Sequence, residues 1–321
     1  MSLAAHLSRF TSSDWTHAVD TLAAAIHPID RDATRIWFAF FPLDLHLALE
    51  AALAEGGDEA ERELAQKLGL MGQWRLADQI DRSHRFLFAH RYWPQVKSAV
   101  SAMTEWPEAL PAIITAAATA ATRTARVDRD LVLGMSAVGL MTLRQVGPEA
   151  FAAAPGVIHL TDRVRARSPH QVMSLRARDD RQGLLGALRG IGKRWTVTFD
   201  ENDPAATFPL IHNQEIASAA QADKRDYRSR DPRCTPDEGP IPVECRAASC
   251  GTCWVGVLGG AEKLSPVSER DEGRRMKVFG YSGTDGAQPL IRLSCQARAR
   301  GAVSIVIPPW NGMFGKALGR R

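Results

Sequence analysis

The sequence has no apolar run long enough to cross a membrane. Its most apolar stretches, residues 109–121 and 131–143, are short and flanked by charge, whereas a membrane-spanning helix needs about 20 apolar residues. Residues 1–9 lack the basic start and apolar core that are typical of a signal peptide. We therefore expect a cytoplasmic protein with no transmembrane segment.

Nucleotide-binding motifs are also missing. The chain has neither a G-x-G-x-x-G after a predicted strand nor a P-loop, so we expect no domain for FAD, NAD or ATP. The net charge is +4 and the pI is about 8.9. The sequence has, however, no stripe of basic residues and no motif of a nucleic-acid-binding domain. Nucleic acid is therefore not an expected partner.

Cysteine is scarce, yet four of the five cysteines form a pattern. Three lie in Cys245-Arg-Ala-Ala-Ser-Cys250-Gly-Thr-Cys253, with C-x4-C-x2-C spacing, and Cys295 follows later in Arg-Leu-Ser-Cys-Gln. This is the ligand spacing of a plant-type [2Fe–2S] cluster, in which four thiolates hold two irons. The spacing predicts that these four cysteines are the metal ligands.

The residues between the first three cysteines are small. A loop around a cluster must bring its backbone N–H groups close to sulfur, and small side chains allow that approach. Glycine can also adopt a positive φ there. The residues expected to bind the cofactor, besides the four cysteines, are Arg246, Ser249, Gly251 and Thr252. No catalytic residue is predicted.

Two other interpretations of the cysteines are a zinc site and disulfide bonds. A zinc site normally uses two Cys-x2-Cys pairs or added histidines, and here the second half of the pattern is Cys295 alone. Disulfides are the other alternative, but cytosolic thiols stay reduced. The fifth cysteine, Cys234, lies in a polar, proline-rich stretch and is predicted to be a spectator thiol.

At these residues the chain resembles the [2Fe–2S] plant-type ferredoxin family, over about residues 193–309. Besides the cysteine loop, the resemblance is carried by residues 194–199, 254–260, 264–272, 292–296 and 302–308. It implies a β-grasp fold, in which one helix packs across a mixed sheet. It also implies one-electron transfer to or from a redox partner protein.

The chain departs from the family pattern in two places. Family members usually carry glycine where this chain has Ala248, and a methyl group restricts φ. An apparent insertion at residues 225–239 precedes the cysteine loop.

With 321 residues, the chain is too long for one ferredoxin, and two domains are expected. The predicted fold class is α+β: an all-α domain at residues 1–160, a basic linker at 161–192 and a [2Fe–2S] ferredoxin-like domain at 193–321. Arginines and glycines crowd the linker. This segment reads either as a solvated connection or as a dock for an acidic partner.

Apolar periodicity, caps and breakers predict the helices of the first domain. They cover residues 12–27, 31–41, 42–57, 58–69, 73–92, 108–125 and 128–146, and a short helix is predicted at 184–188. Residues 1–160 match no family that we recognise from sequence.

Two carboxylate-x-x-His steps fall on these predicted helices, namely Asp14…His17 and Asp81…His84. Di-iron bundles use such steps, although with Glu. His90 lies nearby in the sequence and reads as a buried or half-buried histidine.

Three functions stay open from the sequence. The first is an electron carrier or electron-transfer subunit, with the helical domain for docking or assembly. The second is a self-contained oxidoreductase with a second metal or haem site in that domain. The third is a structural or redox-sensing subunit of a larger assembly.

Overall fold

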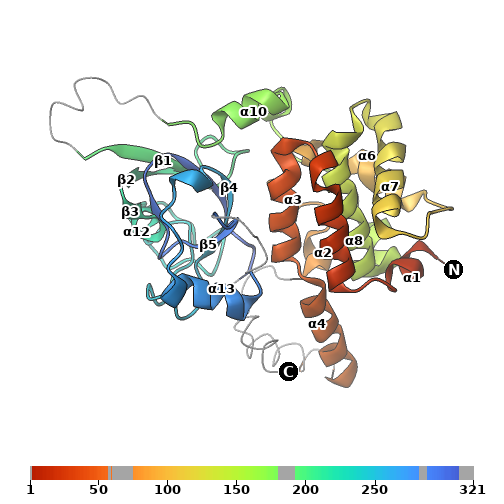
Figure 1. Cartoon of the computed structure of the whole chain (residues 1–321), viewed down its shortest axis with the longest axis horizontal. Coiled ribbons are helices and arrows are strands. Elements are labelled where there is room, and N and C mark those ends of the chain that lie inside the picture. The colour runs from red at the N-terminus through yellow and green to blue at the C-terminus, as the bar shows by residue number, and fades with distance from the viewer. Residues whose placement is uncertain (1, 57–58, 60–74, 180–191, 282–287, 311–321) are drawn as a thin grey trace. The chain divides into compact units, whose positions relative to one another are not determined.

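The computed structural model describes residues 2–56, 59, 75–179, 192–281 and 288–310 (Figure 1). The chain divides into two compact units. Unit 1 comprises residues 1–50 and 75–169, and unit 2 comprises residues 51–74 and 170–321. The predicted helices at 58–69 and 184–188 lie outside the described residues, apart from residue 59.

Unit 1 is built from helices. Its α-helices are α1 (Leu3–Leu7), α2 (Ser12–Leu22), α3 (Pro28–Phe40), α4 (Leu43–Gly56, which runs past the unit's limit at residue 50), α6 (Trp93–Ser101), α7 (Leu110–Ala125), α8 (Arg129–Ala153) and α9 (Asp162–Arg165). Short 3₁₀ helices are η1 (Ala23–Ala25), η2 (Leu76–Gln79) and η3 (Phe88–Tyr92). The helical prediction for this half is confirmed.

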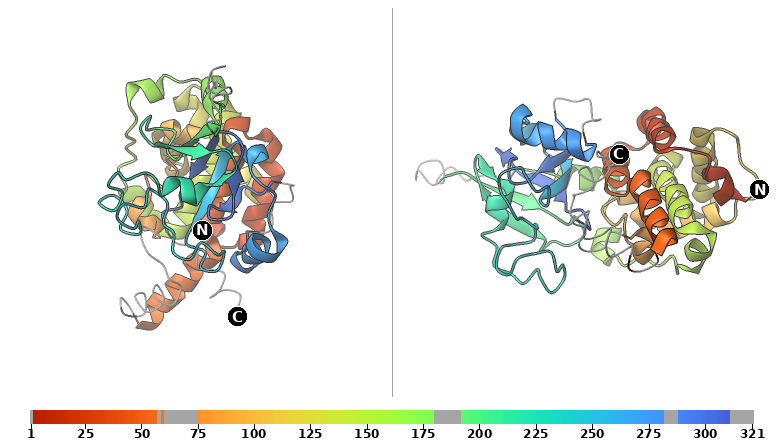
Figure 2. Two further views of the ribbon diagram at one scale, coloured as in Figure 1. Left: turned by 90° about the vertical axis from the view of Figure 1, so that its left-hand side faces the viewer. Right: turned by 90° about the horizontal axis from the view of Figure 1, so that it is seen from below.

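Helix α8 forms the core of unit 1. Every residue from 132 to 143 is buried, as expected of a helix that is apolar all round. It packs against α3, α6 and α7, and Figure 2 shows these helices from two further directions. Gly134 permits the contact with α3, because a Cβ there would lie 2.3 Å from Thr34 Oγ1. The helix turns at Gly147, whose φ of 81° is non-helical, and Pro148 follows.

The prediction of one helix over residues 73–92 is wrong. Residues 75–92 form two 3₁₀ helices joined by turns. The buried Asp30 carboxylate of α3 accepts hydrogen bonds from the backbone N–H groups of Phe88 and Ala89, both at 2.7 Å. These donors therefore serve a tertiary contact instead of a continuous α-helix.

Several helix ends also differ from the prediction. Pro94 does not stop a helix; it lies in the first turn of α6, where proline costs no hydrogen bond. In the same way Pro28 begins α3, although residues 27–28 were expected to close the preceding helix. The N-cap of α2 is Thr11, directly before the predicted start at residue 12, and Asp14 completes a capping box with it.

Unit 2 contains a five-stranded mixed sheet. Its strands are β1 (Arg194–Thr198), β2 (Thr207–Ile211), β4 (Trp254–Gly259), β5 (Ile291–Leu293) and β7 (Val303–Val306). The strand order is β2-β1-β7-β4-β5. Among the described strands of this sheet, β1 and β7 pair in parallel and the other neighbours pair antiparallel. A small second sheet joins β3 (Gln214–Glu215) to β6 (Arg298–Ala299).

Short helices complete unit 2: α10 (Pro169–Leu175), α12 (Ile216–Ala220), η4 (Ala261–Lys263), the π-helical turn η5 (Glu269–Gly273) and α13 (Arg274–Phe279). Helix α12 packs against β2 and buries Ile216, Ala217, Ala219 and Ala220. The mixed sheet and the helical half confirm the predicted α+β class.

The structure describes the segment predicted as a basic linker, residues 161–192, up to residue 179 and again at residue 192. Residues 161–169 belong to unit 1, whereas residues 170–179 belong to unit 2. Arg176 makes a bidentate ion pair with Glu201 at 2.8 and 2.9 Å, and Asp179 pairs with Lys263 at 2.8 Å. These contacts lie before residue 193, where the ferredoxin-like domain was expected to begin. The independent folding of residues 193–321 stays a prediction.

Candidate metal centre

The cysteine loop follows an unusual backbone path. Arg246, Ala248 and Gly251 have φ values of 52°, 53° and 77°, in the left-handed region that L-residues rarely adopt. Such turns direct successive N–H groups toward one side of the chain. The N–H groups of Ser249 and Cys250 both donate to Cys245 Sγ at 3.3 Å. The loop therefore presents backbone donors to sulfur, as predicted.

The four cysteines of the motif lie in two pairs. In the first, the N–H of Cys250 donates to Cys245 Sγ at 3.3 Å. In the second, Cys253 and Cys295 lie close enough for each side chain to shift the pKa of the other. The backbone holds the second pair together. Ser294 directly precedes Cys295, and its N–H donates to the carbonyl oxygen of Cys253 at 3.0 Å.

The two pairs differ in depth. Cys253 and Cys295 are 1% and 3% exposed, whereas Cys245 and Cys250 are half-buried. Across the described residues, no three His, Cys, Asp or Glu side chains surround a single point as ligands of one ion would. A binuclear cluster with two thiolates on each iron fits paired cysteines better than a single tetrahedral zinc does.

Each pair contains one thiol that is easier to ionise. Burial raises the pKa of Cys245, but hydrogen bonds from Ser249 and Cys250 outweigh burial and lower this pKa to about 6. The hydrogen bond from Cys253 lowers the pKa of Cys295 to about 7 despite burial. The same hydrogen bond, together with burial, raises the pKa of Cys253. Burial raises the pKa of Cys250. Metal binding displaces these shared protons, because thiolate is the binding form.

The other predicted loop residues act mainly through their backbone. Ser249 is exposed and contributes its N–H group, while Gly251 is buried at a positive φ. The exposed Arg246 offers its carbonyl oxygen to Gln296 Nε2 at 3.3 Å. Thr252 uses its side chain: Oγ1 accepts from the N–H of Glu244 at 3.2 Å and lies 3.1 Å from Cys250 Sγ.

Three further residues support the site and were not predicted. Gln296 Nε2 donates to Cys295 Sγ at 3.5 Å, and Arg275 Nε of α13 donates to Ala248 O at 2.7 Å. The Ser294 side chain interacts with Cys253. Ser294 and Gln296 flank a predicted ligand, which is a signal in the sequence. Nothing in the sequence marks Arg275, because its contact depends on where α13 packs.

Cys234 lies apart from the pairs. It is buried, and its sulfur donates to Pro240 O at 3.5 Å. Burial, with the nearby Asp231, raises the pKa of Cys234 to about 11, so the group is a neutral thiol. Its spectator role stays a prediction. None of the five cysteines forms a disulfide.

Ala248 occupies a position that favours glycine. An L-residue in the left-handed region costs about 1–2 kcal/mol, and glycine costs about 0.5–1 kcal/mol in extra chain entropy. We predict that Ala248→Gly raises the free energy of unfolding of unit 2 by about 0.5–1 kcal/mol. Denaturant unfolding followed by far-UV circular dichroism measures this change.

The neighbouring Ala247 is the matched control. It is exposed and has no positive φ, so Ala247→Gly should lower the free energy of unfolding by about 0.5–1 kcal/mol. If both variants are destabilised equally, the left-handed conformation of Ala248 does not strain the loop.

Unit 1 does not assemble the predicted carboxylate–histidine steps into a site. Asp14 bonds to the Thr11 side chain at 2.7 Å, and His17 is exposed. Asp81 accepts from Trp93 Nε1 at 2.7 Å and from the N–H of Gly156 at 2.8 Å. Both carboxylates therefore have structural partners.

His84 and His90 form a buried pair, with 2.9 Å between their Nδ1 atoms. His84 Nε2 lies 3.2 Å from Ile80 O, so it carries the proton, and His84 Nδ1 accepts from His90. Burial, with the charges of Arg85 and Arg91, lowers the pKa of His90 to about 3. The pair is a neutral element of the core.

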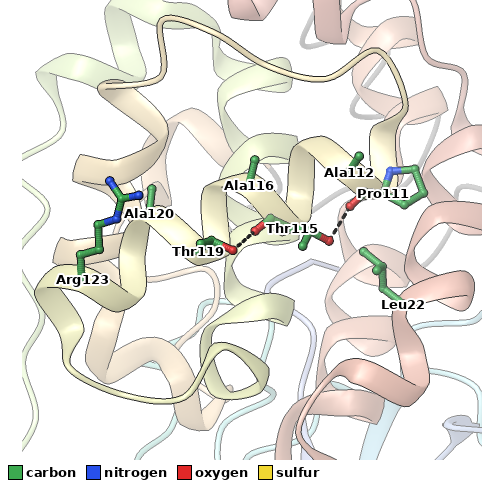
Figure 3. Close-up of a pocket in the computed structure, with 8 residues that line it drawn as sticks. All are labelled: Leu22, Pro111, Ala112, Thr115, Ala116, Thr119, Ala120 and Arg123. Carbon is green, nitrogen blue, oxygen red and sulfur yellow. Dashed lines mark hydrogen bonds between the residues drawn. The ribbon is translucent and has the colours of Figure 1, made fainter.

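A shallow hollow of about 620 Å³ lies on α7 of unit 1 (Figure 3). Leu22 of α2 borders it, and Arg123 lies at one end. Its other lining side chains are small, and the hydroxyls of Thr115 and Thr119 donate back to carbonyl groups of their own helix.

The comparison with known families decides the nature of the centre. Residues 237–300 match the family described as the 2Fe-2S iron-sulfur cluster binding domain. This part of the chain is a ferredoxin-type domain. It binds a [2Fe–2S] cluster and supports electron transfer through that cluster. No family matches the helical half. No curated protein and no solved structure matches the chain.

In the part of the chain that the structure describes, no helix has both the length and the apolar character needed to cross a bilayer.

Proposed function

We propose that the chain is a cytoplasmic one-electron carrier or electron-transfer subunit, in which Cys245, Cys250, Cys253 and Cys295 are the four cluster ligands. Cys245 and Cys250 would hold one iron, and Cys253 and Cys295 the other. The observation that carries the proposal is the pairing of these cysteines within a domain of the matching family: the N–H of Cys250 donates to Cys245 Sγ, and the N–H of Ser294, next to Cys295, donates to Cys253 O.

The difference in depth between the two pairs sets the side from which a redox partner approaches the centre most closely. A bound [2Fe–2S] cluster supplies one-electron redox chemistry, with a potential of about −400 mV in plant-type ferredoxins. The half-buried Cys245 and Cys250 lie beneath an exposed stretch that includes Ala247 and Ser249. The partner's redox centre approaches most closely on this side.

The residues around the cysteines tune the centre. Backbone N–H groups of the loop and the Gln296 amide donate to cysteine sulfur. Such donors stabilise the more negative, reduced form and exclude water from it. Arg275 fixes the Ala248 peptide through its carbonyl oxygen, which keeps the neighbouring N–H groups aimed at sulfur.

Unit 1 serves as a docking or assembly module in this proposal. It has its own core around α8. Its half-buried Asp81 accepts a hydrogen bond from Trp93 Nε1, and its buried His84 and His90 bond to each other, so all three have structural partners. The cytoplasmic location rests on the five free thiols, which persist in reducing compartments.

Iron analysis with EPR of the anaerobically purified full chain tests the proposal. We expect two irons and two sulfides per chain, with one electron taken up on reduction and an EPR signal from the reduced form. Cys234→Ser should retain this iron content and this signal. A protein with one zinc, or with iron that is lost in Cys234→Ser, would contradict the ligand assignment.

A further inference from the structure

Ser294 carries a buried hydroxyl whose hydrogen bonding is incomplete. The residue is 0% exposed, and among the described residues its Oγ has no hydrogen-bond partner. Its backbone is satisfied: the N–H donates to Cys253 O at 3.0 Å, and the carbonyl accepts from the N–H of Ala217 at 2.9 Å. Burying a hydroxyl without a hydrogen-bond partner is energetically unfavourable. The hydroxyl is therefore placed for a group that binds beside it.

The position of Ser294 points to the cluster as that group. The residue directly precedes Cys295, and its backbone pairs with Cys253. Its hydroxyl is also near enough to Cys253 to act on that thiol. Both cysteines form the deeper pair, which is buried from solvent.

Thr252 makes a similar contact at the other pair. Its Oγ1 accepts from the N–H of Glu244, which leaves its proton for Cys250 Sγ at 3.1 Å. Each cysteine pair therefore has one hydroxyl beside it. The Thr252 hydroxyl also holds the loop through Glu244, whereas the Ser294 hydroxyl makes no such bond to the described residues.

We propose that Ser294 is a positioning residue whose hydroxyl donates a hydrogen bond to sulfur at the Cys253–Cys295 end of the cluster and thereby raises its reduction potential. The inference rests on the proposed ligand set. Reduction adds one electron, supplied by an external reductant, and hydrogen bonds to a more negative acceptor are stronger. The hydroxyl therefore stabilises the reduced form more than the oxidised form.

Redox titration of the full, cluster-loaded chain tests this role. At a fixed potential, Ser294→Ala should lower the ratio of reduced to oxidised protein roughly tenfold, a shift of about 59 mV for one electron. Ser294→Thr keeps the hydroxyl and should stay close to the unmodified protein. Ser294→Val has the shape of threonine without the hydroxyl and should shift like Ser294→Ala.

Ser304 provides the matched control. It is also a fully buried serine of unit 2, but its hydroxyl donates to Glu201 at 2.6 Å. Ser304→Ala should change the stability of unit 2 and leave the midpoint potential unchanged. A loaded Ser294→Ala protein with an unshifted potential would overturn the inference, as would equal potentials for Ser294→Thr and Ser294→Val. A wild-type chain without two irons would instead refute the proposed function.

Discussion

Replacing Cys295 with alanine is expected to abolish stable cluster binding and to destabilise unit 2, while unit 1 stays folded. One iron loses a thiolate, and no His, Asp or Glu joins the cysteines as a replacement ligand within the described residues. With the proposed ligands, the cluster would also link the loop that ends at Cys253 to Cys295, just after β5 and far along the chain. Loss of this link frees a long loop, and metal-binding energy is folding energy.

Visible absorption, far-UV circular dichroism and limited proteolysis of Cys295→Ala measure these effects. Cleavage should concentrate in unit 2, and the helical signal should persist. Cys234→Ala is the matched control, because it removes a buried thiol of the same unit that lies outside the two pairs. A full two-iron spectrum in Cys295→Ala would remove this residue from the site. Joint melting of both units would show that they fold as one.

Glu272→Gln is expected to lower the free energy of unfolding of unit 2 by about 3–5 kcal/mol. Glu272 and Arg292 are 1% and 2% exposed and form a bidentate ion pair, with both contacts at 2.9 Å. Glu272 also accepts from the N–H of Leu293 at 2.7 Å. Glutamine leaves the buried guanidinium without a counter-charge, and it weakens the turn–strand contact that positions Cys295.

Two comparisons separate the ion pair from a general effect of mutation. Glu272→Leu combined with Arg292→Met removes both charges and should recover much of the lost stability, because paired burial is costly in itself. Glu215 forms an exposed pair with Arg298 at 3.0 Å, so Glu215→Gln should cost at most about 1 kcal/mol. Denaturant unfolding of all variants gives the values. Equal losses at Glu272 and Glu215 would contradict the prediction.

The sequence by itself determined the cluster-binding domain. Three of the four predicted ligands lie in one short loop, so their spacing indicates the site before any folding is considered. The small residues of the loop predicted backbone donors, and Ser249 and Cys250 supply them. The positive φ of Gly251 was also foreseen. These features are local, because neighbouring residues decide them.

Sequence periodicity also identified the helical half, because an apolar stripe or an apolar run must be buried wherever it packs. The prediction from periodicity was wrong at residues 75–92. There two backbone N–H groups donate to the carboxylate of Asp30, which lies far away in the sequence. A local sequence pattern carries no information about so distant a partner.

Only the tertiary structure decided which distant groups meet. It placed residues 170–179 with unit 2 through Arg176 and Asp179, and it buried Glu272 against Arg292. It also left the Ser294 hydroxyl beside the deeper cysteine pair without a partner among the described residues. The free energy of a buried polar or charged side chain depends on how deeply it is buried and on which hydrogen-bond partners lie beside it. Both are determined by how the chain packs.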